Sequence, residues 1–129
     1  MAKLPLDKNK VKQMNPLVLA FVGDGVDTLY VRTKLAVESS SKAGALHVQA
    51  SKEVNARAQS EQVEKVIEIL TEEEKEIYLR ARNSKNRHHA KNYSVADYRR
   101  ASGLEAVIGY LYLIGETERL EELFEKMER

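Results

Sequence analysis

Two apolar segments of this chain each carry an acidic residue among glycines, a combination that few folds accommodate. In FVGDGVDTLY, Asp24 has a glycine on each side, and in ASGLEAVIGYLYL, Glu105 lies between Gly103 and Gly109. Both segments are typical of helices, where an interior glycine costs about 1 kcal/mol relative to alanine and an unpaired buried acid costs more. Glycine at a helix crossing lets two backbones come close together. We therefore expect a central helix pair whose acidic side chains reach across to each other.

The two acids point to a metal ion. Carboxylates brought together inside an apolar bundle repel each other, and a divalent cation removes that repulsion. Ligation by oxygen alone, with several retained waters, is typical of Mg²⁺, for which Mn²⁺ is a substitute. The sequence therefore predicts a Mg²⁺ site held by Asp24 and Glu105. The alternative is that Asp24 hydrogen-bonds a neighbouring helix end and that Glu105 pairs with Arg99 or Arg100.

Helical periodicity dominates the sequence, and no segment has the convincing alternation of a β-strand. Residues typical of helix starts are Asn15 before Pro16, Ser60, Thr71 with Glu74, and Ser94 with Asp97. Gly115 is expected to end the helix that contains Glu105. We predict an all-α fold of about six helices, over residues 16–37, 43–58, 61–70, 72–82, 95–114 and 116–127.

Length and composition narrow the class of protein. The 129 residues are expected to form one domain, with residues 1–14 as a partly flexible basic N-terminal segment. The absence of cysteine excludes disulfides, thiolate zinc sites and a cysteine nucleophile. The N-terminal sequence lacks the apolar core of a secretory signal, and no segment approaches a membrane span. A cytoplasmic protein is the resulting expectation.

A net charge of +1 hides a concentrated basic region. The stretch YLRARNSKNRHHAKNYSVA contains no acidic residue, whereas EQVEKVIEILTEEEKE and ETERLEELFEKMER are strongly acidic. Clusters of cationic side chains bind phosphate groups, so we expect residues 80–91 to form a mobile loop that contacts a nucleic acid. The alternative is an ordinary solvated loop. The candidate binding residues are Arg80, Arg82, Asn83, Ser84, Lys85, Arg87, His88 and Lys91.

The two acidic motifs resemble the active-site helices of a known enzyme family. LAFVGDGVDTLYVR resembles the signature helix of the ribonuclease III endonuclease domain, and GLEAVIGYLYL is similar to the second helix of that active site. The order of the motifs, their separation and the basic loop before the second one are similar to the Mini-III branch, which has the nuclease domain alone. The resemblance covers nearly the whole chain and implies a ribonuclease III endonuclease-domain-like helical bundle.

The resemblance implies an activity as well. Asp24 and Glu105 match the metal-binding aspartate and glutamate of the two motifs. A Mg²⁺-dependent endoribonuclease would cleave double-stranded RNA and leave 5′-phosphate and 3′-hydroxyl ends. The implied substrate is the precursor of the large-subunit ribosomal RNA, and a ribosomal protein bound to that precursor is a candidate partner.

A homodimer is also implied, with each protomer supplying one metal site to an RNA duplex that lies across the interface. The helix expected over residues 16–37 carries more apolar residues than one small bundle needs. We expect part of this surface to be buried against a second copy, independently of the metal. The residues concerned are Val18, Phe21, Val22, Val26 and Leu29.

Several positions depart from the family pattern. Leu17 and Ser102 stand where full-length ribonuclease III enzymes have further acids, which is similar to the Mini-III pattern. Thr28 replaces the usual glutamate, Asp27 replaces an aromatic or aliphatic residue, and Gly25 replaces the typical alanine. Asp27 lies near the helical face of Asp24. We interpret it as a residue that only solvates the helix, with a further metal ligand as the alternative.

Two other classes of protein remain open. The Asp27–Thr28 pair is consistent with a non-catalytic helical module that binds RNA on a ribonuclease III scaffold. Glu105 and both glycine pairs favour the enzyme, because a binding module has no need of their energetic costs. The third class is a helical adaptor that docks an acidic protein, and it predicts no retention of RNA at moderate salt.

Overall fold

A computed structural model describes residues 3–38, 42–84 and 94–128. Within these ranges the protein is entirely helical, which confirms the predicted all-α class, with seven α-helices in place of about six. No helix in these ranges is long and apolar enough to cross a bilayer. The elements are α1 (Lys8–Lys12), α2 (Pro16–Glu38), α3 (Ala43–Glu53), α4 (Ala56–Val66), a 3-10 turn η1 (Ile67–Ile69), α5 (Glu72–Arg82), α6 (Val95–Leu113) and α7 (Thr117–Met127).

Capping side chains set the starts of α2, α5 and α6 where the sequence predicts them. The Asn15 side chain accepts a hydrogen bond from the Leu17 amide at 2.8 Å, directly before helix α2 begins. Thr71 forms the predicted capping box of α5 with Glu74. Ser94 accepts from the Asp97 amide at 3.0 Å and begins α6. These side chains satisfy amides that have no partner inside the helix.

The helix predicted over residues 43–58 is divided into two, which is a correction. Asn55 has an extended backbone between α3 and α4, and its side chain accepts a hydrogen bond from the Ala58 amide at 2.9 Å. This cap begins a new helix in a new direction. Ser60, expected to cap a helix, is instead buried inside α4. The strong N-cap propensity of Asn55 therefore overrides the continuous helical pattern.

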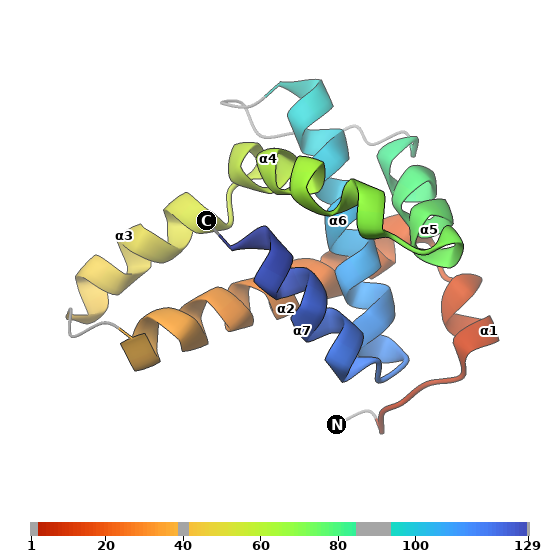
Figure 1. Ribbon diagram of the computed structural model, residues 1–129, viewed down its shortest axis with the longest axis horizontal. Coiled ribbons are helices and arrows are strands. Elements are labelled where there is room, and N and C mark those ends of the chain that lie inside the picture. Colours follow the sequence, from red (N-terminus) through yellow and green to blue (C-terminus); the bar gives the residue numbers. More distant parts are fainter. Residues whose placement is uncertain (1–2, 39–41, 85–93, 129) are drawn as a thin grey trace.

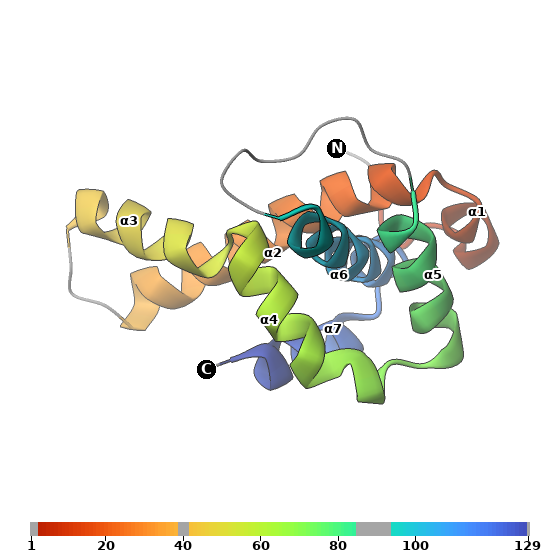
Figure 2. The ribbon, with the colours of Figure 1, turned by 90° about the horizontal axis from the view of Figure 1, so that it is seen from above.

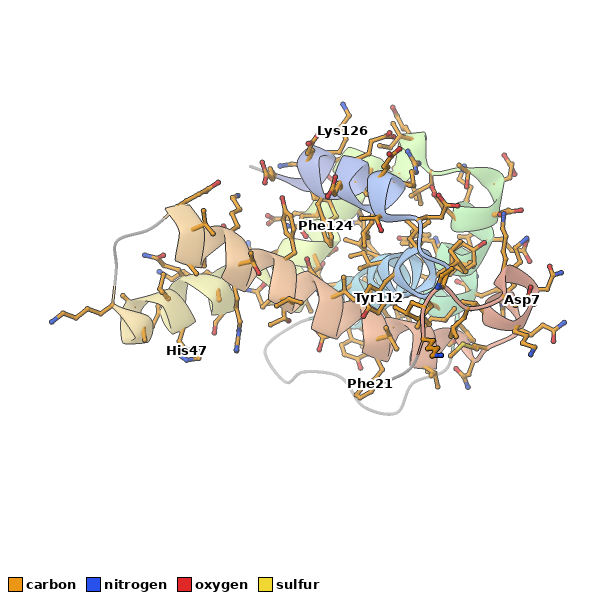
Figure 3. The ribbon with its side chains drawn as sticks, turned by 90° about the horizontal axis from the view of Figure 1, so that it is seen from below. Asp7, Phe21, His47, Tyr112, Phe124 and Lys126 are labelled. Carbon is orange, nitrogen blue, oxygen red and sulfur yellow. The ribbon has the colours of Figure 1, made fainter. Side chains whose placement is uncertain are left out.

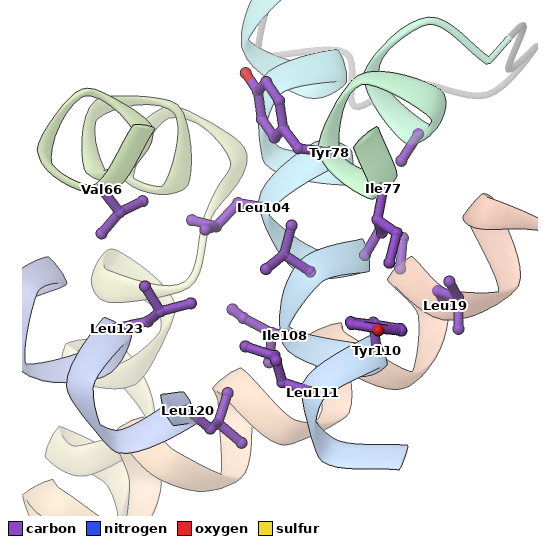
Figure 4. Close-up of a cluster of buried hydrophobic side chains, with 14 of the residues drawn as sticks. Leu19, Val66, Ile77, Tyr78, Leu104, Ile108, Tyr110, Leu111, Leu120 and Leu123 are labelled. Carbon is purple, nitrogen blue, oxygen red and sulfur yellow. The ribbon is translucent and has the colours of Figure 1, made fainter. Parts of the chain in front are cut away.

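Helix α6 is the centre of the fold. It lies between α2 on one side and α4 and α7 on the other, with α5 alongside (Figures 1 and 2). Leu104, Ile108 and Leu111 of α6 are buried against Leu123 of α7 and Val66 of α4 (Figure 4). Because α6 is apolar on nearly all sides, it can only be placed where other helices surround it. Its acidic residue, Glu105, is thereby brought into the interior of the bundle.

Helices α1 and α3 lie at opposite ends of the molecule and make different contacts with the rest of it. Helix α1 lies inside the N-terminal segment that we expected to be partly flexible, and its Val11 is fully buried in the core. Lys8 and Lys12 both form ion pairs with Glu73 of α5, at 2.8 and 2.9 Å. At the opposite end, α3 packs beside the C-terminal half of α2 and extends away from α6 (Figures 1 and 2). Ala50 is the buried residue of α3.

Candidate metal centre

Helices α2 and α6 cross in direct backbone contact. A Cβ atom added at Gly23 would lie 1.7 Å from the carbonyl oxygen of Glu105. One added at Gly109 would lie 2.0 Å from the carbonyl oxygen of Leu19. Neither position can hold a larger residue unless the helices move apart. The prediction that glycines allow a close crossing is confirmed for this pair.

The other two glycines of the motifs have different roles, which corrects the expectation that all four make room at one crossing. Gly103 faces the ring and carbonyl of Tyr78, at the contact between α6 and α5. Gly25 has no atom within 4 Å of its added Cβ among the described residues. Successive residues on a helix point in different directions, so only one glycine of each pair faces the other helix.

Asp24 and Glu105 line the same pocket, which has a volume of about 250 Å³. Asp24 is exposed at its rim, and Glu105 is half-buried. The structure therefore brings the two acids to one site, as the sequence predicts. Among the described residues Glu105 has no ion-pair partner, and Arg100 pairs with Glu64 at 3.7 Å instead. The remaining lining residues are Val54, Ala56, Gln59, Tyr98, Ala101 and Ser102.

Burial and mutual repulsion disfavour the ionised form of both carboxylates when no metal is bound. Burial, followed by the charges of Asp24 and Asp27, raises the pKa of Glu105 to about 9, against the opposing effect of a hydrogen bond from Gln59. Burial also raises the pKa of Asp24. A metal-free site therefore favours a protonated Glu105 at neutral pH. A bound cation would favour both ionised carboxylates.

The chemistry of the donors fits a hard divalent cation. Two carboxylates face a pocket with room for water, whereas the described residues contain no group of three or more His, Cys, Asp and Glu side chains that could hold a metal. Zn²⁺ in proteins usually takes at least three side-chain ligands. Mg²⁺ binds through one or two carboxylates and keeps several waters, and Mn²⁺ accepts the same ligands. Asp24 and Glu105 suit these ions.

Comparison with known proteins agrees with this geometry. The family model of the ribonuclease III domain matches residues 17–116, which include nearly all of α2, all of α6 and both acids. A Mini-ribonuclease 3 from Thermoanaerobacter sp. is 46% identical over 120 residues, which are 93% of this chain and 84% of the relative. This chain belongs to the ribonuclease III family. A second relative, the Mini-ribonuclease 3 of Staphylococcus aureus, is 44% identical over 92% of this chain and 90% of its own.

A crystal structure of another protein shows a similar fold. The protein is from Fusobacterium nucleatum, is 33% identical, and superposes with a TM-score of 0.79 over 88% of this chain and 90% of its own. Within the ribonuclease III family, the short Mini-ribonuclease 3 enzymes are thus the group that this chain resembles along most of its length.

Asp27 is one of the positions where this chain departs from the ribonuclease III pattern, and our interpretation of it is wrong. The side chain does not solvate the helix, because the residue is only 3% exposed. It accepts a hydrogen bond from Gln59 Nε2 at 2.9 Å. Burial raises its pKa to about 6, against the effect of that hydrogen bond. Asp27 also does not line the pocket of Asp24 and Glu105.

Gln59 lines the pocket and is 1% exposed, although the sequence did not predict it as a site residue. One signal was present. Gln59, Val63 and Val66 have the i, i+4, i+7 spacing of a buried helical face, and all three are buried. An amide at an apolar position needs a polar partner inside the protein. The sequence indicates that need but does not identify the partner.

The basic region is described only in part. Arg80 and Arg82 form the last turn of α5, so the loop expected over residues 80–91 begins later. Arg80 donates to the carbonyl oxygens of Lys12 and Met14, at 2.7 and 3.4 Å, and thereby connects α5 to the N-terminal segment. These bonds direct its guanidinium toward the protein. A contact with RNA through Arg80 stays a prediction.

Three neighbours of Arg80 complete the described part of this region. Arg82 lies over the ring of Tyr78, 6.0 Å from its centroid, and donates to the exposed Asn83 at 3.1 Å. Ser84 donates to the carbonyl oxygen of Arg80 at 2.7 Å. The candidates outside the described residues are Lys85, Arg87, His88 and Lys91.

An apolar face of α2 is exposed near the site. Phe21 is 81% exposed and points away from the bundle (Figure 3). Val18 and Leu29 are also exposed, whereas Val22 and Val26 pack partly against the core. The sequence identified this set without distinguishing the two groups. The outward group forms an apolar surface that the described residues of the chain leave uncovered.

Proposed function

We propose that this protein is a divalent-metal-dependent endoribonuclease that cleaves double-stranded RNA. The observation that carries the proposal is the shared pocket of Asp24 and Glu105, built at the contact between α2 and α6. Membership of the ribonuclease III family supports an endoribonuclease, and the relatives named Mini-ribonuclease 3 support the short, single-domain type.

Asp24 and Glu105 would hold Mg²⁺, or Mn²⁺ in its place. When bound, such an ion supplies a water of lowered pKa and neutralises charge on a phosphodiester. Asp24, at the exposed rim, would face the RNA, and the half-buried Glu105 would anchor the ion from below. The backbone contact at Gly23 keeps the two carboxylates on adjacent helices at a fixed separation.

The proposed substrate is an RNA duplex from the large-subunit ribosomal RNA precursor, cut to give 5′-phosphate and 3′-hydroxyl ends. A-form RNA is recognised through its backbone and shape, so basic side chains would provide most of the affinity. The basic region after α5 is the proposed contact. A ribosomal protein on the precursor is a proposed partner, and the cytoplasm is the proposed compartment.

A homodimer is part of the proposal. The exposed apolar residues of α2, Val18, Phe21 and Leu29, would be buried against the same face of a second copy. Two symmetry-related pockets would then act on opposite strands of one duplex. Each strand would be cut at a fixed stagger.

The test is cleavage of a long RNA duplex by the purified protein with Mg²⁺. We expect fragments with 5′-phosphates, no cleavage in EDTA, and recovery of activity with Mn²⁺. A single-stranded RNA of the same sequence and a DNA duplex are the matched substrates, and neither should be cut. Binding of the RNA duplex without cleavage would contradict the proposal.

A non-catalytic RNA-binding module is the second candidate, favoured by Asp27 and Thr28 in place of the usual family residues. Restoring the family residue with Thr28→Glu separates the two. If the native chain is inactive and this variant cleaves RNA, the module is correct. Cleavage by the native chain identifies the enzyme.

A further inference from the structure

Three acids interact at the crossing of α2 and α6, but only two of them line the pocket. Asp27 and Glu105 influence each other electrostatically, as do Asp24 and Glu105. Asp27 does not line this pocket and instead lines a separate small cavity with Glu53 and Gln62. It is therefore not placed to bind an ion directly. Any effect of Asp27 on the site must pass through a neighbour.

Gln59 is that neighbour. Its Nε2 donates to Asp27 Oδ2 at 2.9 Å, its side chain lines the same pocket as Glu105, and a hydrogen bond from it acts to lower the pKa of Glu105. A carboxamide nitrogen carries two hydrogens, and ionised carboxylates only accept. One amide nitrogen can therefore serve both acids, provided that the amide does not turn its oxygen toward them. A turned amide would bring its oxygen against a carboxylate and repel it.

Burial holds this arrangement in one orientation. Asp27 is 3% exposed and Gln59 is 1% exposed, so water is not available to replace either partner. A buried amide or acid without a partner costs about 1–3 kcal/mol. The hydrogen bond to Asp27 therefore selects the orientation in which the Gln59 nitrogen faces the acids. Glu105 then meets an amide hydrogen of Gln59 and not the amide oxygen, which favours its ionised carboxylate.

We propose that Asp27 and Gln59 are positioning residues for the candidate metal site, in which Asp27 fixes the amide of Gln59 and Gln59 directs the carboxylate of Glu105 toward Asp24. The inference rests on the proposed function for the role of the ion but concerns residues of this chain alone. Partners behind a metal ligand orient it, and their loss typically weakens metal affinity about 10–100-fold.

The test measures Mn²⁺ binding to the RNA-free protein by electron paramagnetic resonance, so that it does not depend on cleavage. Gln59→Met keeps the length of the side chain and removes its hydrogen bonds, and we expect the Kd for Mn²⁺ to rise about 10–100-fold. Asp27→Leu should have a similar effect. Asp27→Asn, which still offers an oxygen to Gln59, should have a smaller one.

Two matched controls separate positioning from general effects. Gln62→Met changes the same residue type one turn later on α4, where Gln62 Oε1 is buried without a hydrogen-bond partner among the described residues. Glu53→Gln removes a charge that also acts on Asp27. Both controls should leave the Kd within about twofold of the wild-type value. A thermal melt of each variant checks that it is folded, and Asp27→Asn continues the test if Gln59→Met does not fold.

The outcomes separate this inference from the proposed function. Wild-type Mn²⁺ affinity in Gln59→Met and Asp27→Leu would overturn the inference, as would equal losses in the two controls. The inference would also be overturned if the native protein has no Mn²⁺ site that is lost in Asp24→Asn. Mn²⁺ binding that depends on Gln59, in a protein that cuts no RNA duplex, would support the inference and contradict the proposed function.

Discussion

Gly23 of α2 and Gly109 of α6 face each other across the helix crossing. A Cβ on Gly23 would lie 2.9 Å from the Gly109 nitrogen, and one on Gly109 would lie 3.0 Å from the Gly23 nitrogen. Asp24 follows the first glycine directly, and Glu105 precedes the second by one helical turn. The separation of the two acids therefore depends on how closely these backbones approach.

Gly23→Ala should destabilise the protein by about 1–3 kcal/mol, because its Cβ would overlap the Glu105 carbonyl and the packed helices must move apart. Urea denaturation measures the loss. Gly25→Ala is the matched control on the same helix, since its Cβ meets no described atom within 4 Å. It should stabilise the protein by up to about 1 kcal/mol through helix propensity. Equal effects of the two variants would contradict the backbone contact.

Asp24→Asn and Glu105→Gln should each abolish cleavage while the fold remains intact. Each change keeps the size of the side chain and removes the charge that a cation requires. Single-turnover cleavage of an RNA duplex measures activity, and circular dichroism checks the helices. Ser102→Ala is the control. It tests whether any substitution in the pocket lining reduces cleavage as much as the two acid variants do. Activity of either acid variant at the native rate would place the metal elsewhere.

The stability of the metal-free protein should fall as the pH rises from about 4.5 to about 9. Glu105 has its pKa raised to about 9 in the folded protein, so the folded state binds its proton more tightly than the unfolded state over this range. The stabilising effect is complete below the unfolded pKa and is lost as the pH rises through the folded value.

Thermal melts in EDTA across this pH range measure the effect. Glu105→Gln should remove most of the slope and be more stable than the native chain at pH about 8, by about 1–2 kcal/mol, since water reaches the half-buried side chain and weakens the effect. Excess Mg²⁺ should reduce the slope in the native chain. A slope that is unchanged in Glu105→Gln would assign the titration to another group.

Phe21→Ser should convert the proposed homodimer to a monomer, because it removes a large apolar side chain from the surface of α2 that would be buried between protomers. Light scattering after size-exclusion chromatography measures the mass. Val37→Ser is the matched control, since Val37 is 80% exposed on the same helix, as Phe21 is at 81%. It should leave the dimer intact. A native chain that is monomeric at micromolar concentration would contradict the interface.

Alanine at Arg82, Lys85 and Arg87 together should raise the apparent KM for RNA and flatten its salt dependence. Each lost phosphate contact should reduce the slope of log affinity against log salt by about 1. The rate at saturating RNA should survive, because Asp24 and Glu105 are unchanged. Alanine at Arg99 and Arg100 is the comparison. If only that pair changes the slope, RNA follows the start of α6 instead.

Local signals in the sequence were enough to find most helices and both acids. Asn15, Thr71 and Ser94 cap their helices as predicted, because a cap depends on residues within one turn of it. The division at Asn55 was missed because the helical patterns before and after it continue into each other, although asparagine is a common N-cap residue. The high apolar content of the two acid-bearing segments also predicted that they form the central helix pair, and α6, which is apolar on nearly all sides, is the helix that the others surround.

Local patterns in the sequence are enough to predict an all-α fold, the two segments that carry acids and the convergence of these segments. The side chains that support the two acids become visible only when the helices are packed together. The sequence indicates that Asp27, three positions after Asp24, is solvated. In the structure Asp27 is buried and bonded to Gln59, which is 32 positions away. Gly23 and Gly25 are equivalent in sequence, yet only Gly23 meets α6. Periodicity shows that a residue faces inward, but only the packing of α2 and α4 against α6 shows what it meets there.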